Sequence, residues 1–579
     1  MPNDYTKNFE RNGRRERPII DINMLSRTFL PGLVLSLVLS LLPAAAAFGQ
    51  LASFPKPAYF RETFARPVTK VELQSPVRLD DYVVNGKLEL SLRGYLELVM
   101  ANNTDIAIQR LTVDVAQNAI TRAFAAFDPL ATASFSSTEQ RTPSGDQLTS
   151  GAGASTLVEL SQPANFNYAQ TLPTGLQYNV DFAAQKLSTN SGYYYYNPTL
   201  TSSLQLNISQ PLIKNRGAYI NRVPIMVATS TLRKTEYDLK TSLLQLVSNA
   251  ENAYWDAILA RENLRVAESA RDLADQALKR AQRELELGAL SPLDIYNPEQ
   301  QYATSKIGVS QAQYALKQTE DALRRQIGAD LDQKIRTLPI VLTETVAPEV
   351  DAPPIDAEKE VHKALGARPD LKSATQSLDI DDLGISLAKN ELLPDLELTG
   401  SYSTQGLGGV FYPQSAGPGV LPAPAAVPGG FGDALSQMFS FGYPMYSFGL
   451  TLTLPIKSHR ASADMADALV AKKRDTLTVR TVRQQVRLDV LTAVSQVESS
   501  KDAMKLSVVA QDFSRKYMEA EQKKYELGNS TIFFVLQAQG ALVTAESTVV
   551  QNAVGYRRNL MNLLLRTGDL LEARGIAAP

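Results

Sequence analysis

Long stretches of the chain place small and apolar residues every three or four positions, which is the spacing of one face of an α-helix. The two longest, Asn221–Leu287 and Ala463–Leu527, contain no glycine, and only Pro224, near the start of the first, departs from the pattern. At a rise of ~1.5 Å per residue each predicts a helix of roughly 100 Å. Four further helices, each about half as long by the same rise, are expected at Ser91–Phe127, Pro292–Ile327, Ala357–Leu392 and Thr531–Arg566. Two short helices placed end to end match one long helix, so we expect a bundle of uniform height.

The first long helix carries a stripe of small residues. Heptad-like spacing is typical of coiled-coil packing, and a slip in that spacing changes the winding locally. The stripe predicts close helix packing, although an ordinary long coiled coil would show it too. Its members are Ala250, Ala253, Ala257, Ala260, Leu264 and Ala267, resuming after a slip at Ala270, Ala274, Ala277 and Ala281.

Between the helices lie two regions in which apolar and polar residues alternate, at about 129–210 and 394–454. Such alternation predicts strands with one apolar face, in a sheet or a membrane barrel. Loops hold the aromatic clusters Tyr193–Tyr196 and Phe439–Phe448, which could be interfacial belts or ordinary surface loops. We expect 406–432, rich in Gly, Pro and Ala, to be an external loop, and additional strand material near 155–186 to lie either in the membrane or above it. The clearest alternating runs are Ala131/Ala133/Phe135, Tyr178/Val180/Phe182, Leu204/Leu206/Ile208, Leu396/Leu398 and Leu450/Leu452/Leu454.

The chain contains a weak internal duplication. Asp105 and Pro129 are 24 positions apart, as are Asp370 and Pro394. The pair Leu-Gly at Gly288 recurs at Gly528, and each is followed 40 positions later by another glycine, Gly328 or Gly568. Strand-proline segments Gln210–Ile213 and Leu454–Lys457 also correspond. Each half therefore reads as short helix, strands, long helix, tip and short helix.

Physical closure of the sheet requires several copies of the chain. A sheet that crosses lipid must close, because open edges leave backbone groups unpaired in hydrocarbon. About four membrane strands are expected in each chain, whereas bacterial barrels need at least ~8. Several copies must then share one barrel, with a shared helical tube below it, and such an assembly is a conduit.

Composition excludes several classes of function. The net charge of −2 gives no field that would indicate nucleic-acid binding. The chain has no cysteine, which excludes disulfides, thiolate metal sites and a lipid-modified N-terminal cysteine. Its two histidines, His362 and His459, stand at unrelated places, and no phosphate loop, nucleophile elbow or paired zinc ligands are present. We therefore expect no enzyme, cofactor or metal site.

The N-terminus has the pattern of a secretion signal. Basic residues precede the apolar run Phe29–Leu42, which is short for a membrane span and is followed by small residues. Cleavage is expected after Ala47 or Gly49, Met24 is a second candidate start, and a membrane anchor is the alternative. The expected domains are a signal peptide at 1–49, an N-terminal linker at 50–89, a first repeat at 90–328, an inter-repeat linker at 329–356, a second repeat at 357–568 and a tail at 569–579.

In the duplicated Asn-x-x-Asp…Pro-x-Leu segments, the strand-proline entries and the Leu-Gly tips, the chain resembles the TolC-like outer-membrane efflux proteins. The resemblance covers about 90–568. It implies an α+β fold in which a long antiparallel α-helical coiled-coil barrel is fused to a transmembrane β-barrel completed by trimerisation. It also implies a homotrimer with about four strands per chain in a barrel of about twelve.

The family resemblance further implies location and partners. The expected site is the cell outer membrane of a Gram-negative-type bacterium, with the helices extending into the periplasm. The implied function is the passive exit duct of a tripartite efflux or type I secretion system, for drug export or another substrate. The implied partners are outer-membrane lipid, a periplasmic adaptor (membrane fusion) protein and an inner-membrane pump of RND, ABC or MFS type, without nucleic acid.

The resemblance places the functional residues at the two helical tips. Adaptor-binding turns are expected at Gly288, Ala289, Leu290 and Ser291, and at Gly528, Asn529, Ser530 and Thr531, where each glycine also suits a simple helix cap. A hydrogen bond between Asp294 and Tyr525 is expected to hold a periplasmic gate closed. Phe534 and Gln537 stand where well-known members carry an acidic ring, so we expect an apolar constriction. The alternative is that Phe533 or Phe534 packs between helices.

A non-pore, periplasm-spanning coiled-coil structural or surface protein remains the alternative function. It predicts no conductance and no barrel, and it gives no role to the duplicated strand-proline segments.

Overall fold

The computed structural model describes residues 78–143, 156–191, 194–330, 332–346, 354–412 and 427–576. The chain divides into two units, 1–74 and 75–579, and every described residue belongs to the second. The expected signal peptide, most of the N-terminal linker and part of the predicted 406–432 loop lie outside the described residues.

The helices follow the predicted order along the chain. The expected helices at 91–127 and 357–392 are each divided in two, at Asn103 and at Arg368, and the long helices run without a break. The duplication thus holds at the level of helices as well as motifs. The principal helices are α3 (Leu92–Asn102), α4 (Thr104–Phe124), α5 (Ala218–Glu286), α6 (Tyr296–Gln326), α7 (Ala357–Ala367), α8 (Pro369–Glu391), α10 (His459–Glu526) and α11 (Ile532–Thr567).

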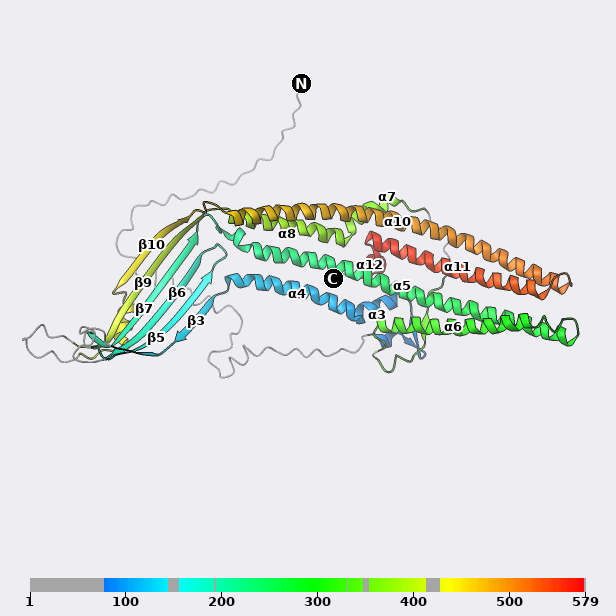
Figure 1. The fold of residues 1–579 in the computed structure, drawn as a ribbon, viewed down its shortest axis with the longest axis horizontal. Coiled ribbons are helices and arrows are strands. Elements are labelled where there is room, and N and C mark those ends of the chain that lie inside the picture. The colour runs from blue at the N-terminus through cyan, green and yellow to red at the C-terminus, as the bar shows by residue number, and fades with distance from the viewer. Residues whose placement is uncertain are drawn as a thin grey trace, which may run out of the picture. The chain divides into compact units, whose positions relative to one another are not determined.

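These helices lie side by side in a single row (Figure 1). Near the strands the order of contacts is α4, α5, α8, α10, and toward the tips it is α6, α5, α11, α10. Two long helices therefore run through the whole row, while α4 gives way to α6 and α8 gives way to α11. This is the end-to-end stacking that the sequence predicts.

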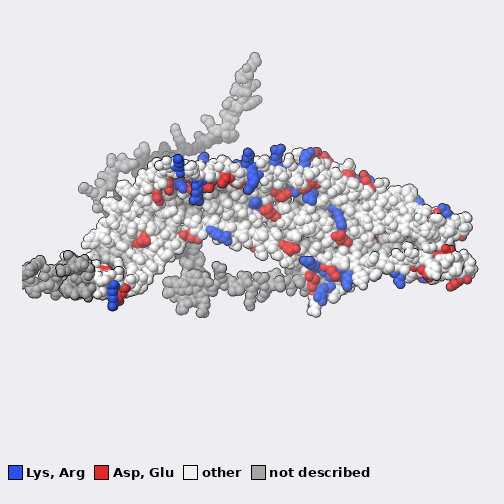
Figure 2. All heavy atoms as spheres, in the orientation of Figure 1, with Lys and Arg blue, Asp and Glu red and all other residues white. Residues whose placement is uncertain are grey.

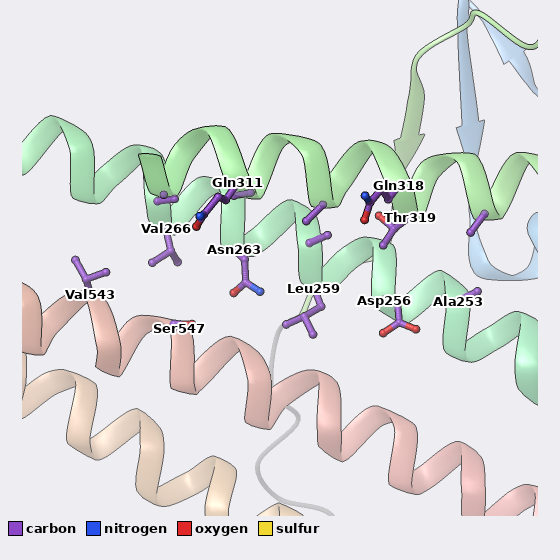
Figure 3. A pocket seen from close by; sticks show the side chains of 16 residues that line it. Ala253, Asp256, Leu259, Asn263, Val266, Gln311, Gln318, Thr319, Val543 and Ser547 are labelled. Atoms are coloured by element: carbon purple, nitrogen blue, oxygen red, sulfur yellow. The ribbon is translucent and has the colours of Figure 1, made fainter. Parts of the chain in front are cut away.

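The alanine stripe of α5 lies in the helix contacts. Ala250, Ala257 and Ala281 are buried, whereas Ala253 and Ala260 line an open groove of about 670 Å³ between α5, α6 and α11 (Figure 3). Among the described residues, α11 is the one helix long and apolar enough to cross a membrane by composition. In this chain α11 packs along α10 and α5, which buries part of its apolar surface.

One large antiparallel sheet continues the helical row. Its order is β10-β9-β7-β6-β5-β3, and β4 also pairs with β5. Because β3 and β4 lie end to end along β5, the seven strands occupy six side-by-side positions, which we call lanes. The strands are β3 (Leu130–Phe135), β4 (Thr138–Pro143), β5 (Thr156–Thr171), β6 (Gln177–Thr189), β7 (Tyr196–Pro211), β9 (Asp395–Phe411) and β10 (Pro444–Thr453).

Four of the lanes are direct continuations of helices. Strand β3 follows α4, β7 precedes α5, β9 follows α8 and β10 precedes α10, so lanes and helices share one order. The hairpin β5–β6 lies between β3 and β7 and has no helix of its own. The sheet therefore has more lanes than the four strands implied by the family resemblance.

The two faces of this sheet differ in polarity. Alternate residues of a strand share a face, and paired residues on neighbouring strands lie on the same face. In the central part of the sheet, one face is apolar and the other carries Ser, Thr, Asn, Gln and Asp. Members of the apolar face are Ala133, Phe135, Phe166, Tyr168, Val180, Phe182, Leu204, Leu206, Leu398, Tyr402, Phe448 and Leu450.

A short helix, α9 (Phe431–Phe439), covers one end of the apolar face. Ser202 donates a hydrogen bond to the Ala434 carbonyl, and Ala434 and Met438 are buried. A Cβ at Gly406 would stand 1.8 Å from the Ala434 oxygen, so glycine is required for this contact. The predicted 406–432 loop was wrong at both ends: 406–411 continue β9, and α9 begins within the segment.

The two predicted linkers pair with each other. Strands β1 (Val83–Val84), β2 (Lys87–Leu90) and β8 (Ile340–Leu342) form a second sheet, in which β2 and β8 are parallel. Leu88 and Leu90 are buried in the largest apolar core, together with Tyr95 and Tyr254 of the helical row. These segments therefore brace the middle of the row.

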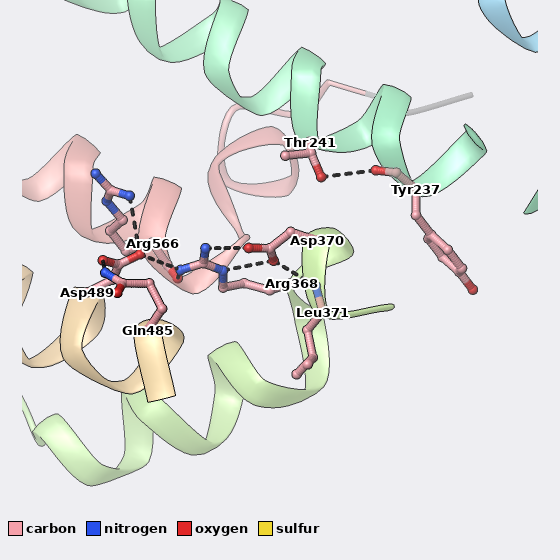
Figure 4. Close-up of polar contacts among 8 residues, drawn as sticks. All are labelled: Tyr237, Thr241, Arg368, Asp370, Leu371, Gln485, Asp489 and Arg566. Carbon is pink, nitrogen blue, oxygen red and sulfur yellow. Dashed lines mark hydrogen bonds and ion pairs between the residues drawn. The ribbon is translucent and has the colours of Figure 1, made fainter. Parts of the chain in front are cut away.

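Polar side chains hold the point where α8 gives way to α11 (Figure 4). Arg368 forms ion pairs with Asp370 at 2.6 Å and with Asp489 of α10 at 3.1 Å. Asp489 also pairs with Arg566 of α11 at 3.3 Å. The side chain of Arg368 is only 13% exposed, so this cluster ties three helices together in a partly dry setting.

Candidate helical-tip site

Both tips are built by the same backbone turn. At the end of α5, the amide of Ala289 donates to the Glu284 carbonyl at 2.8 Å and that of Gly288 donates to the Leu285 carbonyl at 3.0 Å. At the end of α10, Asn529 and Gly528 repeat the pattern. This is the Schellman cap, in which a left-handed residue stops the helix.

The glycines fit that cap. Gly288 and Gly528 have φ of +71° and +75°, a conformation that other residues resist. Gly328 and Gly568, which end α6 and α11, have φ of +72° and +87°. The helix-cap reading of these positions is confirmed, and the duplication extends to the backbone of all four helix ends.

The predicted adaptor residues lie on the exposed turns. Ala289 and Thr531 are exposed, while Leu290 packs against a small core formed by Ala281, Ile295 and Ile532. Ser291 accepts the Asp294 amide on its carbonyl at 3.0 Å and so starts the turn into α6. Ser530 donates to Glu521 at 3.1 Å.

In each predicted Leu-Gly tip the leucine is strongly exposed. Leu287 is 83% exposed and Leu527 is 76% exposed, each directly before its tip glycine. Large apolar side chains in water at equivalent places of two tips indicate contact with a partner.

The two tips are joined by a polar network around Tyr525. Its hydroxyl donates to the Glu284 carboxylate of the neighbouring tip. Arg280 pairs with Glu284 at 3.0 Å and with Glu526 at 3.3 Å, and its guanidinium carbon lies 4.9 Å from the centre of the Tyr525 ring. The sequence reading missed both Arg280 and Glu284, although their i, i+4 spacing on α5 is that of a helical ion pair.

Asp294 acts on Tyr525 by its charge. A tyrosine has one hydroxyl proton to donate, and in this chain Glu284 receives it rather than Asp294. Burial first, then the hydrogen bond to Glu284 and the charges of Glu284 and Asp294, raise the pKa of Tyr525 to about 12, while Arg280 opposes them. Asp294 itself is exposed.

Phe534 and Gln537 lie on one exposed face of α11. Phe534 is 46% exposed and Phe533 is 55% exposed, and their rings meet edge to face with centres 5.6 Å apart. Neither ring is packed between helices within this chain. Among the described residues no group of three His, Asp or Glu side chains could hold a metal.

Charged side chains are unevenly distributed along the chain. In Figure 2 they are spread over the helical rows and the tips, whereas few appear over the sheet. Strands with few charges beside charge-rich helices are the distribution expected where one part meets hydrocarbon and the other meets water.

Comparison with known proteins agrees with this architecture. Residues 361–569 match the family model of the outer membrane efflux protein. The chain is 23% identical over 339 residues to the pyoverdine export outer membrane protein OpmQ of Pseudomonas aeruginosa, covering 56% of this chain and 61% of that protein. It is 23% identical over 255 residues to the cobalt-zinc-cadmium resistance protein CzcC of Cupriavidus metallidurans, covering 40% and 59%. The chain thus spans about three fifths of the length of the curated relatives it matches.

Solved structures share the fold. The crystal structure of the CmeC outer membrane channel of Campylobacter jejuni superposes with a TM-score of 0.58 at 16% identity, over 83% of this chain and 86% of that one. The match therefore includes both the helical row and the sheet. Residues 361–569 therefore carry an outer membrane efflux protein domain, in a chain that shares the fold of solved outer membrane channels.

Proposed function

We propose that this protein is an outer-membrane exit duct, which conducts substrates passively from the periplasmic side to the exterior. The observation that carries the proposal is a sheet with one apolar and one polar face that continues into a row of long helices, and whose two edges have no further partner among the described residues. Closing such a sheet puts the apolar face against lipid and the polar face around a pore. The helices below then enclose the same conduit.

Three copies close the duct in this proposal, as the family resemblance implies. The duct works with a periplasmic adaptor and an inner-membrane pump of RND, ABC or MFS type, in a tripartite efflux or type I secretion system. Energy comes from the pump, since the duct needs only shape and polarity. The export and metal-resistance names of OpmQ and CzcC support an efflux role over secretion of proteins.

The tips are the proposed adaptor contacts. The two Schellman turns at Gly288 and Gly528 project backbone and small side chains into solvent, and Leu287 and Leu527 stand exposed beside them. An adaptor with apolar pockets at two equivalent places would bury these leucines. Leu287→Asp with Leu527→Asp should abolish adaptor binding, measured by surface interferometry, and leave conductance unchanged.

The gate is proposed at the same end. The link from Tyr525 to Glu284, assisted by Arg280 and Asp294, holds the tip of α10 beside the tip of α5 and keeps the entrance narrow. Phe534 and Gln537 of each copy face the axis, so three phenylalanines form an apolar constriction that excludes water. Trivalent cations should then block the wild-type channel weakly and a Phe534→Asp channel strongly.

Conductance tests the proposed function directly. The full protein, purified in mild detergent, should have the mass of a trimer and should open discrete channels in planar bilayers. A monomer, or a trimer that never conducts, would refute the duct and leave the coiled-coil spacer. The substrate class is then identified by combining the duct with candidate adaptors and pumps.

The gate has its own pH test. Because the pKa of Tyr525 is raised to about 12 from its usual 10.0, the neutral hydroxyl and its link are fully present below pH 10 and are lost as pH rises through 12. Conductance should rise over that window in the wild type. The conductance of the Tyr525→Phe channel should be raised at neutral pH and should show no further rise with pH. The Asp294→Ala substitution should shift the pH at which the conductance rises. Wild-type behaviour in both variants would count against the gate.

A further inference from the structure

The hairpin β5–β6 is a full part of the large sheet. Strand β5 pairs with β3 on one side and with β6 on the other, and β6 pairs with β7 through eleven successive residue pairs, from Gln177↔Ser209 to Leu187↔Thr199. Across the sheet, Ala133, Phe166, Phe182 and Leu204 stand at one level, each opposite the next. The hairpin thus separates β3 from β7 by two lanes.

Both faces of the sheet continue across the hairpin. Phe166 and Phe182 extend the apolar face that begins at Leu204. On the opposite face, Asp181 accepts hydrogen bonds from Asn167 and Asn179 within the hairpin and from Asn207 of β7. A hairpin that lay above the membrane would not need the same apolar band at the same level.

The hairpin also spans the full depth of the sheet. Strands β5 and β6 have 16 and 13 residues, and a tilted membrane strand needs about 9–11. Their turn docks on the helical end, where the Gly217 amide donates to the Thr174 carbonyl at 3.2 Å. Gly175 has φ of +90°, and a Cβ there would stand 2.7 Å from the Asn215 oxygen.

The width of the sheet matches the width of the helical row. Strands about 4.8 Å apart and tilted by about 40° each occupy about 6.3 Å of circumference, so six lanes span about 38 Å. Four helices at about 9 Å span about 36 Å, whereas four lanes would span only about 25 Å. With the hairpin included, sheet and helices close on similar radii.

The sheet leaves two edges for other copies. Among the strands that the structure describes, β10 has a neighbour on one side only, and so has the lane of β3 and β4 at the opposite edge. We propose that β10 of each copy pairs with the β3–β4 lane of the next, and that three copies, each giving six lanes, close a barrel of eighteen lanes. The copy number rests on the proposed function; the six lanes rest on the chain itself.

Cysteine pairs test this arrangement, because the chain has no cysteine of its own. In the full protein in lipid nanodiscs, Phe182→Cys with Leu204→Cys should cross-link efficiently, since these residues are opposite each other. The matched control is Ala133→Cys with Leu204→Cys, which lie at the same level but with two lanes between them. The first pair should cross-link several-fold more than the second, and electron microscopy should show eighteen lanes.

Each of the other possible outcomes of these experiments would refute a defined part of the proposal. Efficient cross-linking of the Ala133 and Leu204 pair, or a trimer with twelve lanes and normal conductance, would place the hairpin outside the barrel and refute the eighteen-lane inference alone. Two copies closing twelve lanes would refute the copy number and with it the inference. Absence of any oligomer or conductance would refute the duct itself.

Discussion

An arginine placed on either face of β7 gives a decisive test of which face meets lipid. Leu206 lies on the apolar face opposite Val180 and Tyr402, and Asn207 lies on the polar face, within 3.4 Å of Asp181. An arginine on the lipid face near the bilayer midplane costs about 2–4 kcal/mol, whereas a lumenal one is nearly free. At about 1.4 kcal/mol per tenfold, Leu206→Arg should shift the folding equilibrium by a factor of roughly 30 to 1000.

The assay is urea-dependent folding into phosphatidylcholine vesicles, followed by tryptophan fluorescence and by heat-resistant trimer on gels. Leu206→Arg should lower the urea midpoint strongly, and Asn207→Arg should leave it near the wild type because Asp181 can receive the new charge. In detergent micelles, which adapt their shape, the difference in urea midpoint between the two variants should be smaller. Equal losses in vesicles, or a greater loss for Asn207→Arg, would refute the assignment of the faces.

Three further substitutions test other parts of the fold. Gly406→Ala should loosen α9, at about 1–3 kcal/mol for an overpacked contact, and make it sensitive to protease, whereas Gly400→Ala on the same strand meets no atom within 4 Å and should be silent. Arg368→Ala removes a largely shielded cation between α8, α10 and α11, and should lower the stability by about 1.5–3 kcal/mol in thermal melts; an unchanged melting temperature would count against the cluster. Burial, and then the charge of Asp475, raise the pKa of Asp381, so ionisation there opposes folding. Asp381→Asn should therefore raise the melting temperature at pH 7, with the gain vanishing as acid protonates the wild type; a gain that persists in acid would contradict this.

Helices and turns were predictable because their causes are local. The spacing of small residues along α5 and α10, together with the absence of glycine, predicts a helix whatever elements the segment packs against. Gly288 and Gly528 mark helix ends by their own conformational freedom. The duplication supplied the order of elements even though the two halves share few residues.

The missed features depend on contacts between distant segments. Strand β2 (Lys87–Leu90) pairs in parallel with β8, some 250 positions later. The sequence near β2 does not indicate this pairing, because the alternation of a short strand does not identify the strand with which it pairs. Similarly, the place of β5–β6 between β3 and β7 follows from pairing across the sheet. At the tip, two carboxylates compete for one hydroxyl, and only the approach of the two tips in the folded chain decides for Glu284 over Asp294.

The hairpin β5–β6 suggests how such ducts could change width during evolution. Within the part of the chain that the structure describes it occurs in the first repeat only, enters and leaves the sheet at the same end, and adds two antiparallel lanes without altering the order of any helix. Because a hairpin adds lanes in pairs, its gain or loss keeps the outer strands antiparallel to their neighbours in the next copy. The membrane part could thus be widened by a single insertion, while the helical tips kept the surface that a partner recognises.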